Sequence, residues 1–447
     1  MSKQDCQIAV IGGGLAGCMA ATAAARSGIS VTLIEDYGFL GGWATAALVT
    51  PFMSREASDG AQLVAGLFEE LSLRLRERGG LLGTSFDSEV MKHVLQEMVL
   101  EAGVDLMLHT RFEAAEYGSE GRNVVKLNGK SGPREIECLK LIDCSGDGDA
   151  AVSLGADHEM GDENGLCQAL TLMFDMGGVD LVNALTYVRD HADQMRFPKL
   201  APDADPALLA EGVVAVAGYY DMVERARETG DYEVPGDLIF YISRPRRGEV
   251  AFNTTHIGGI DPLNSRDLTR AEIECRRQMM SVVDFVREYV PGFENSYLIR
   301  SAAHVGVRES RRIVGDYVFS ADDVRAGRKF PDAICRLAYP VDVHSGKGDG
   351  YTRGEEHGGP VAPPPGDWYE IPYRCLLPRG LNNVLMAGRC VSSTHEGHGA
   401  IRIMPCCAAM GQAAGTAAAI SVRQNLPPRE IAVRELLNEL RAHGALV

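Results

Sequence analysis

The sequence predicts an α/β fold built on a Rossmann-like nucleotide-binding domain. A strand, a glycine-rich turn, a helix and a second strand follow one another near the N-terminus, over residues 7–11, 12–17, 18–26 and 29–34. Both strands are apolar, the helix is rich in alanine, and Glu35 follows the second strand. This order of elements is typical of a dinucleotide site, whereas the glycine pattern alone would also suit a turn that binds nothing.

The three glycines of the turn are expected to serve different purposes. Gly12 permits a tight turn, Gly14 lets the backbone approach a pyrophosphate, and Gly17 lets the helix pack closely on the strand. The N-terminus of the helix offers unpaired N–H groups and the positive end of its dipole to the phosphates. Glu35 is placed to accept hydrogen bonds from a ribose diol. This favours FAD or NAD over NADP, because a 2′-phosphate would meet a like charge.

Composition and charge exclude several other classes of protein. The chain has 447 residues, of which 45% are hydrophobic, and a formal net charge of −17. The length suggests two domains, and the acidic balance argues against a nucleic acid or an anionic membrane as partner. No stretch reaches the ~18 uninterrupted apolar residues of a membrane span. The N-terminus shows no signal-peptide pattern, so we expect a cytoplasmic protein.

The cysteines predict no metal or disulfide chemistry. There are eleven, scattered along the chain, and no C-x-x-C occurs. This pattern disfavours a disulfide scaffold, an iron–sulfur cluster, a structural zinc and a dithiol redox centre. The adjacent Cys406 and Cys407 are expected to be buried, unreactive thiols. We therefore expect no metal site.

The nucleotide-binding domain is predicted to consist of two separate parts of the chain. Residues 1–156 form its first part and residues 369–447 its second part, around an α+β substrate domain at residues 157–340 that carries no nucleotide signature. Residues 341–368 are expected to be a mobile loop or linker, because the segment is rich in glycine, proline and charge.

Several local elements are predicted from periodicity and turn residues. Strands over residues 104–108, 113–117, 124–127 and 135–140 are expected to form a small antiparallel layer inserted in the nucleotide-binding domain. The segment 144–151 contains a second G-x-G-x-x-A pattern. Its acidic side chains make it a poor pyrophosphate cradle, so we expect it to close the sheet against the first site.

Two helices are predicted in the substrate domain. One covers residues 206–229, with Asp205 as its N-cap and Pro206 at its first position. The other covers residues 268–289, where Thr269 and Glu272 resemble a capping box.

The C-terminal part contains an apolar strand over residues 383–388 that ends in Ala-Gly. A loop follows, and then a helix of very small residues over 408–420. Small side chains let such a helix press close to a sheet, and its N-terminus near Pro405 offers a positive dipole end to a bound group. This is the arrangement that a sheet returning to cover a cofactor requires.

Through these motifs the sequence resembles the FAD-dependent oxidoreductase family with a glutathione-reductase-type FAD domain. It is more distantly similar to the flavoproteins of fumarate reductase and succinate dehydrogenase. The resemblance covers nearly the whole chain and is strongest at residues 12–35, 41–42, 143–149, 306–312 and 387–419. It implies a Rossmann-like FAD-binding domain of this type, an inserted α+β substrate domain and non-covalent FAD. The residues expected to contact FAD are Gly12, Gly14, Leu15, Ala16, Gly17, Glu35, Asp36, Gly41, Gly42, Trp43, Ser145, Gly146, Asp147, Gly388, Arg389, Met404, Gly411 and Ala414.

A shorter likeness points to a substrate contact. The stretch from His398 to Arg402 is similar to the His-Gly-Ala-Asn-Arg stretch of fumarate-reductase flavoproteins, whose arginine holds a substrate carboxylate. Here Ile401 stands where that pattern has asparagine. Arg389 stands where many flavin disulfide reductases place an aspartate against the ribityl chain, so that contact is in question.

The family resemblance implies a hydride passing between flavin N5 and a small polar substrate, carboxylated or sugar-like. Such a step also needs an acid or base and an anchor for the substrate. The catalytic candidates are His398, Arg402, His344 and Arg308, although the segment 308–312 would equally suit an ion-pair network with Glu309 and Asp316. An electron-transfer subunit of a larger redox complex and a non-catalytic flavin-binding module are the alternative functions. The sequence leaves the electron acceptor and the oligomeric state open, a homo-oligomer included.

Overall fold

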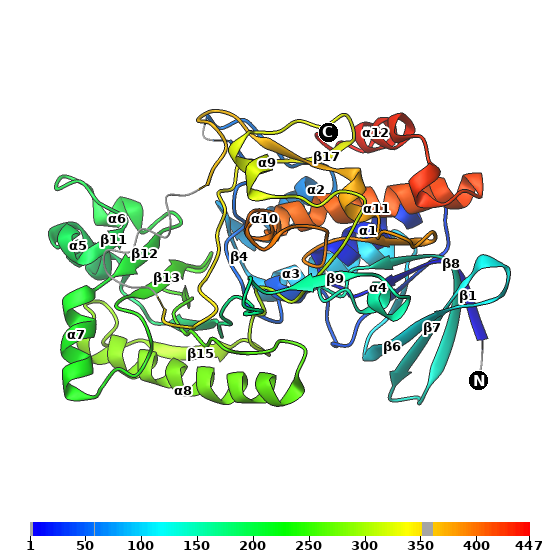
Figure 1. Ribbon diagram of the computed structural model, residues 1–447. Coiled ribbons are helices and arrows are strands. Elements are labelled where there is room, and N and C mark those ends of the chain that lie inside the picture. Colours follow the sequence, from blue (N-terminus) through cyan, green and yellow to red (C-terminus); the bar gives the residue numbers. More distant parts are fainter. Residues whose placement is uncertain (1–2, 58, 351–360) are drawn as a thin grey trace.

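The computed structural model describes residues 3–57, 59–350 and 361–447. Two large sheets dominate it, one near each end of the view in Figure 1. The first sheet has seven strands: β1 (Lys3–Ile11), β2 (Val31–Ile34), β5 (Asp105–Met107), β6 (Thr110–Tyr117), β7 (Asn123–Gly129), β8 (Arg134–Asp143) and β19 (Val384–Met386). This sheet and its helices form the nucleotide-binding domain.

The centre of the first sheet is parallel, as a Rossmann-like domain requires. The strand order is β5-β2-β1-β8-β7-β6, and β19 pairs with β8. β8 has two partners on the same side: its N-terminal half pairs antiparallel with β7, and its C-terminal end pairs parallel with β19, where Ile142 faces Leu385. The two ends of the chain therefore complete one sheet, which confirms the predicted α/β fold.

The prediction for residues 104–140 was wrong in one respect. β5 is not part of an antiparallel layer, because it pairs in parallel with β2, with Leu106 opposite Leu33. Only β6, β7 and the first half of β8 form an antiparallel unit, and this unit is continuous with the main sheet. A short strand pattern does not reveal the partner of the strand, and here the edge of the parallel sheet provided one.

Two small-residue helices pack against each other in the core of this domain. They are α1 (Leu15–Arg26) and α11 (Met404–Gln424), which lie side by side in Figure 1. A Cβ atom added at Gly411 or Gly415 of α11 would lie 2.1 Å from the carbonyl oxygen of Ala16 or Ala20. The glycines are therefore required for this close contact, which brings the start of α11 to the start of α1.

Other helices complete the nucleotide-binding domain. They are α2 (Leu67–Glu77), α3 (Ser88–Glu101), α4 (Asp149–Ser153), α9 (Ala321–Arg325), α10 (His395–Ile401) and α12 (Val433–Ala442). Asp87 caps the start of α3, because its carboxylate accepts hydrogen bonds from the N–H groups of Glu89 and Val90. Among the described residues no single helix is long and apolar enough to cross a membrane, and the pair α10 and α11, bent by 90°, passes that test only when joined.

The second sheet has six strands and belongs to the inserted part of the chain. In spatial order they are β11 (Met195–Phe197), β12 (Ala215–Gly218), β13 (Ile239–Ser243), β14 (Val250–Phe252), β10 (Phe174–Gly177) and β15 (Tyr297–Ser301), and all pairings are antiparallel. The long helix α8 (Ser265–Tyr289) contributes Ala271, Cys275 and Val282 to the core beneath this sheet. α5 (Leu181–Asp190) and α7 (Tyr220–Thr229) pack at its edges.

Both helix predictions for the inserted part need correction. The expected helix over 206–229 is divided into α6 (Pro206–Leu209), β12 and α7, although Asp205 does cap α6 by accepting from the Ala207 N–H. The apolar residues of β12 gain two neighbouring strands, which a local pattern cannot show. α8 begins at Ser265 with Asn264 as N-cap, so the Thr269 hydroxyl instead donates to the Ser265 carbonyl inside the helix.

The chain returns to the nucleotide-binding domain before residue 340. The returning chain forms two short strand pairs: β16 (Arg311–Ile313) with β9 (His158–Met160), and β17 (Ala333–Leu337) with β18 (Tyr369–Pro372). Phe319, Ile334 and Leu337 lie in the core around α1 and α11. The part of the chain that packs around the inserted sheet is therefore shorter than residues 157–340, because Phe319, Ile334 and Leu337 pack in the nucleotide-binding domain.

Residues 341–350, which we call the strap, are packed between the two domains. A Cβ added at Gly399 of α10 would lie 2.6 Å from the Asp342 carbonyl oxygen, so α10 touches the strap closely. On the other side the Gly259 N–H donates to the Gly346 carbonyl at 2.9 Å. The rest of the predicted mobile loop is not described at residues 351–360.

A buried ion cluster also joins the two domains. Asp175 of β10 pairs with Arg244 at 2.7 Å, and their side chains are 1% and 2% exposed. Arg244 also donates to the carbonyls of Phe86 and Leu48 in the nucleotide-binding domain, and Arg300 donates to the second Asp175 oxygen. The inserted sheet is thereby tied to the segments of the nucleotide-binding domain around Leu48 and Phe86.

Candidate active site

A cavity of about 560 Å³, which we call the cofactor cavity, lies where the strands β1, β2 and β8 end. It gathers most of the residues that the sequence predicts to contact FAD. These are Gly12, Gly14, Leu15, Ala16, Glu35, Asp36, Gly41, Gly42, Trp43, Ser145, Gly146, Asp147, Gly388, Arg389 and Met404. Segments from both ends of the chain therefore line one elongated space.

Three predicted FAD contacts lie behind the cavity wall instead. Gly17, Gly411 and Ala414 do not line it. Gly17 is buried against the turn, since an added Cβ would lie 1.8 Å from the Gly12 carbonyl oxygen. Gly411 is pressed on Ala16, and Ala414 is buried in the interior of α11. These three residues shape the cavity through packing and do not face it.

The glycine turn has the form expected of a pyrophosphate cradle. Gly12 has φ +94°, and an added Cβ would lie 2.4 Å from the Cys144 carbonyl oxygen, so a side chain is excluded there. At Gly14 an added Cβ would meet nothing closer than 3.9 Å, so the backbone faces open space. Gly14 is also the N-cap of α1, whose first N–H groups and dipole end point toward the cavity.

Glu35 lies at the end of β2 and is 8% exposed. One carboxylate oxygen accepts a hydrogen bond from the Gly13 N–H at 2.7 Å and the other from the Tyr37 N–H at 2.8 Å. Burial raises the pKa of this carboxyl, while the two amides act in the opposite direction. A carboxylate has about four acceptor positions, so Glu35 can still accept from a ribose diol.

Arg389 is held in the wall of the cofactor cavity by three neighbours. Its guanidinium pairs with Asp147 at 2.7 Å, donates to the Ser310 hydroxyl at 2.7 Å and lies 5.6 Å from the centre of the Trp43 ring. The cradle, Glu35 and this polar wall at residues 145–147 and 389 together fit a dinucleotide such as FAD. The arginine that stands at position 389 is thus paired with an acidic group of the same wall, Asp147.

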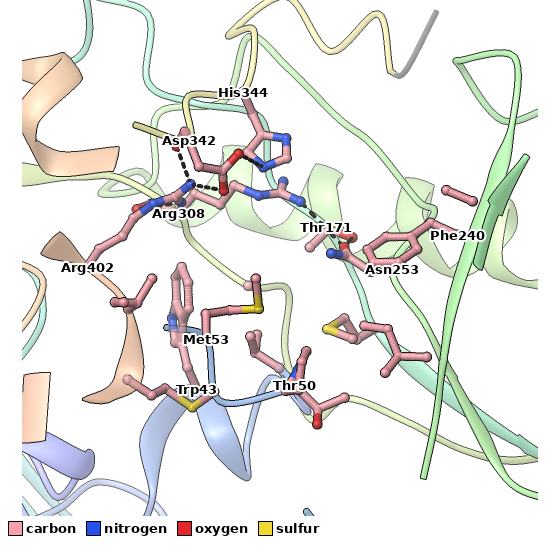
Figure 2. A pocket seen from close by; sticks show the side chains of 18 of the residues that line it. Trp43, Thr50, Met53, Thr171, Phe240, Asn253, Arg308, Asp342, His344 and Arg402 are labelled. Atoms are coloured by element: carbon pink, nitrogen blue, oxygen red, sulfur yellow. Dashed lines mark hydrogen bonds and ion pairs between the residues drawn. The ribbon is translucent and has the colours of Figure 1, made fainter. Parts of the chain in front are cut away.

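A second cavity of about 350 Å³, the substrate cavity, adjoins the first. The two share Trp43, Met404 and Arg402 as lining residues. The walls of the substrate cavity come from the loop at residues 49–53, from the inserted sheet and from the strap (Figure 2). A group bound in the cofactor cavity and a molecule bound in the substrate cavity would therefore meet beside these three shared residues.

One end of the substrate cavity carries a charged cluster (Figure 2). Arg402 donates to the Asp342 carbonyl at 2.9 Å and approaches its carboxylate at 3.4 Å. The other Asp342 oxygen lies 3.5 Å from Nε2 of His344. Arg308 donates to Oδ1 of Asn253 at 3.4 Å, and its own carbonyl accepts from Arg402. Three of these residues, Arg402, His344 and Arg308, were predicted from the sequence.

Among the described residues, this cluster combines two guanidinium groups with a carboxylate and an imidazole. Burial and the Arg308 guanidinium lower the pKa of His344 to about 4, although Asp342 acts in the opposite direction. Burial would raise the pKa of Asp342, but His344, Arg402 and Arg308 hold it well below its usual range. His344 is therefore neutral near pH 7, and Asp342 is an anion beside the two arginines.

His398, the fourth catalytic candidate, lines neither cavity. It is 0% exposed, and its Nε2 lies 2.9 Å from the Arg389 carbonyl oxygen, to which it donates. Burial and nearby Arg402 hold the pKa of His398 well below its usual value. A neutral, enclosed imidazole cannot touch a substrate, so its position corrects the catalytic role expected from the sequence.

The ion-pair network that the sequence also suggested for residues 308–312 is present in part. Glu309 is fully buried and pairs with Arg312, and it accepts from His395 Nδ1 at 2.9 Å. Asp316 takes no part in this network because it pairs with Arg429 at 3.1 Å. Arg308 points the other way, into the substrate cavity.

Sequence reasoning missed several residues of the substrate cavity. They are Asp342, Asn253, Met53, Phe240 and Thr171. Asp342 had a usable signal, because residues two apart in an extended segment point to the same side and His344 was already a candidate. The others come from strands and loops that only the tertiary fold brings together.

Comparison with known proteins assigns the family. Residues 7–440 match the model of the family described as FAD dependent oxidoreductase. No curated protein matches the chain.

Solved structures give weaker likenesses. A geranylgeranyl bacteriochlorophyll reductase-like protein from Thermoplasma acidophilum is 11% identical with a TM-score of 0.47, over 99% of this chain and 84% of that one. A flavoprotein/dehydrogenase from Cytophaga hutchinsonii is 14% identical with a TM-score of 0.44, over 98% and 84%. A p-nitrophenol 4-monooxygenase from Pseudomonas putida is 11% identical with a TM-score of 0.43, over 98% and 84%. At these values they do not bear on the substrate of this chain. The family match spans nearly the whole chain, and the chain therefore belongs to the FAD-dependent oxidoreductase family, with FAD as its cofactor.

Proposed function

We propose that this oxidoreductase transfers a hydride between FAD and a small substrate that carries a carboxylate or a similar anion. The observation that carries the proposal is the position of Arg402, which lines both the cofactor cavity and the substrate cavity. An anion held there would place the neighbouring carbon of the substrate where the two cavities meet. Bound FAD supplies the hydride acceptor or donor, and the protein supplies position and charge.

Arg402 and Arg308 are the proposed anchor. A guanidinium can hold a carboxylate through two parallel N–H donors, and such charge-assisted hydrogen bonds are stronger than neutral ones. Both arginines line the substrate cavity, and their guanidinium groups favour an anionic group over a neutral one. They support the carboxylated class over the sugar-like class, since a neutral sugar would form weaker hydrogen bonds with them.

His344 is the proposed acid or base, with Asp342 as its positioning partner. A neutral imidazole can accept a proton from the group that is oxidised and return it in the reverse reaction. Asp342 faces Nε2 at 3.5 Å and would hold the proton there, so Nδ1 is the basic nitrogen of this tautomer. An anion bound at the arginines would offset part of the positive charge that lowers the pKa of His344, and would make it a stronger base.

The experiment is anaerobic reduction of the flavin in the purified holoprotein by matched pairs of compounds. Each pair consists of a small hydroxy or amino acid and its primary amide. We expect only the acid of a productive pair to bleach the flavin absorbance. Arg402→Ala should lower kcat/KM at least ~30-fold, because truncating one partner of a buried charge pair costs about 2 kcal/mol or more. Arg423→Ala, an exposed arginine on α11, is the matched control.

Two results would overturn this assignment. If the amides bleach the flavin as readily as their acids do, the proposed anionic anchor is refuted. Reduction that occurs only when a cell fraction containing a redox partner is added would favour the electron-transfer subunit instead. A flavin that no compound or fraction reduces, although dithionite does, would favour the non-catalytic module.

A further inference from the structure

The end of the substrate cavity opposite Arg308 and Arg402 is lined mainly by apolar side chains, with Arg196 beside them. Its apolar residues form a row across the inserted sheet. Phe197 of β11 faces Ala217 of β12, and Ala217 faces Phe240 of β13. Asn253, which follows β14, continues the row by donating its N–H to the Phe240 carbonyl at 2.9 Å. All four residues line the cavity. Neighbours across antiparallel strands project to the same face, so the row is one continuous surface.

The two phenylalanines meet edge to face above the small Ala217. Their ring centres are 5.4 Å apart and their planes make an angle of 81°. Phe197 is 38% exposed, which is unusual for a large apolar side chain in a folded interior. The pair therefore offers an apolar face to the cavity that no other side chain among the described residues fully covers.

The facing wall is apolar as well. Val49, Pro51 and Met53 come from the loop that follows the Trp43 segment, and the Met53 side chain is 40% exposed. Methionine adapts its shape to the group beside it and contacts aromatic rings favourably. The cavity thus has a slot between this loop and the phenylalanine pair.

Polarity increases steadily along the row toward the strap. After Phe240 comes Asn253, whose side chain accepts from Arg308, and after Arg308 come Asp342 and Arg402 (Figure 2). A ligand that lies along the row meets aromatic rings at one end and guanidinium groups at the other. A compound of uniform polarity, such as a sugar or a short dicarboxylate, would leave one end unmatched.

We propose that the substrate is an amphipathic carboxylic acid, with an aryl or branched alkyl group against Phe197 and Phe240 and the carboxylate at Arg308 and Arg402. This inference rests on the proposed function for the carboxylate anchor and adds the apolar half. Phe240 is the specificity-determining residue, since it lies in the middle of the row. The apolar group should raise affinity about 10- to 100-fold, comparable to the burial of a phenylalanine side chain.

The test is ligand binding to the holoenzyme, followed through the perturbation of the flavin absorbance spectrum. Three probes are titrated: butyrate, 4-phenylbutyrate and 4-phenylbutanamide. We expect 4-phenylbutyrate to bind at least ~10-fold more tightly than either of the others. Phe240→Ala should remove most of that advantage over butyrate and leave butyrate binding within about twofold of wild type.

Two further variants distinguish a loss of the apolar contact from misfolding. Ala217→Leu fills the slot without removing a ring, and it should weaken 4-phenylbutyrate but spare butyrate. Leu208→Ala is the matched control, because Leu208 lies on α6 of the inserted part and is 68% exposed. It should leave all three affinities unchanged.

The outcomes separate this inference from the proposed function. If the two carboxylates bind equally in the wild type and 4-phenylbutanamide binds poorly, the apolar half is refuted and the anionic anchor stands. If the amide binds as well as 4-phenylbutyrate, the anchor itself is refuted. If 4-phenylbutyrate binds more tightly than butyrate and 4-phenylbutanamide, but Phe240→Ala and Ala217→Leu do not reduce its advantage over butyrate, the apolar group lies elsewhere and the inference is overturned.

Discussion

Replacing Gly415 with alanine tests how closely the cofactor-binding half of the molecule depends on the contact between α1 and α11. An alanine Cβ would lie 2.1 Å from the Ala20 carbonyl oxygen, whereas such atoms are not found closer than 3.0 Å. The obstacle is helical backbone and cannot rotate away. The two helices must therefore move apart by about 0.9 Å.

The expected loss of stability follows from this displacement. A radial gap of about 0.5–1 Å forfeits a quarter to a half of the dispersion energy across a contact, and forced overpacking costs about 1–3 kcal/mol. Alanine in a helix interior is intrinsically better than glycine by about 1 kcal/mol. We therefore expect a net loss of about 1–2 kcal/mol, opposite in sign to the helix preference.

Urea unfolding of the holoprotein, followed by the release of fluorescent flavin, measures this loss. Gly212→Ala is the control, because its added Cβ would meet nothing closer than 3.7 Å. Gly411→Ala should weaken FAD binding more than Gly415→Ala, since it pushes against Ala16 in the first turn of α1, beside the pyrophosphate cradle. A Gly415→Ala protein as stable as wild type would refute the packing argument.

Three other expectations follow from the described residues. The pKa of His344 is about 4 in the folded protein and near 6.5 when unfolded. The stability of wild type relative to His344→Asn, measured by urea titration, should therefore fall by about 1.4 kcal/mol per pH unit as the pH drops from 6.5 to 4. A difference that stays constant with pH would contradict this. Asp175→Asn leaves Arg244 buried without its charge partner and should cost about 3–5 kcal/mol of unfolding free energy, whereas Asn at the exposed Asp322 should cost under about 1 kcal/mol. Burial raises the pKa of the Cys407 thiol to about 12, and the residue lines the cofactor cavity. N-ethylmaleimide should therefore modify Cys407 of the apoprotein slowly, and FAD should block the reaction. Peptide mass spectrometry measures the labelling, and equal labelling with and without FAD would place the cofactor elsewhere.

The sequence predicted the cofactor half of the molecule well, because the binding of a dinucleotide depends on local features. A glycine turn between a strand and a helix needs only consecutive residues, and Glu35 is read from the end of the next strand. The return of the chain at β19 was also visible, since an apolar strand and a helix of very small residues have few other uses. These features can be recognised in the sequence without knowledge of tertiary contacts.

The substrate half could not be predicted to the same depth. β12 reads as part of a helix until β11 and β13 provide its hydrogen-bond partners, so Ala217 and Phe240 could not be placed on one row. Met53 and Asn253 are about 200 positions apart in the chain, and neither stands in a motif. Residues that meet only through packing between two domains carry no local pattern.

In the stretch from His398 to Arg402, the structure does not support the catalytic role that the sequence predicted for His398. The spacing of four residues suggested one catalytic face, and the structure gives each residue a different task. His398 fixes the Arg389 carbonyl beside the cofactor cavity, Gly399 admits the strap within 2.6 Å of where a Cβ would stand, and Arg402 reaches into the junction of the two cavities. Any larger residue at position 399 would push away the segment that carries Asp342 and His344. Through its packing, this stretch therefore brings the wall of the cofactor cavity, the pair of Asp342 and His344, and Arg402 to one place.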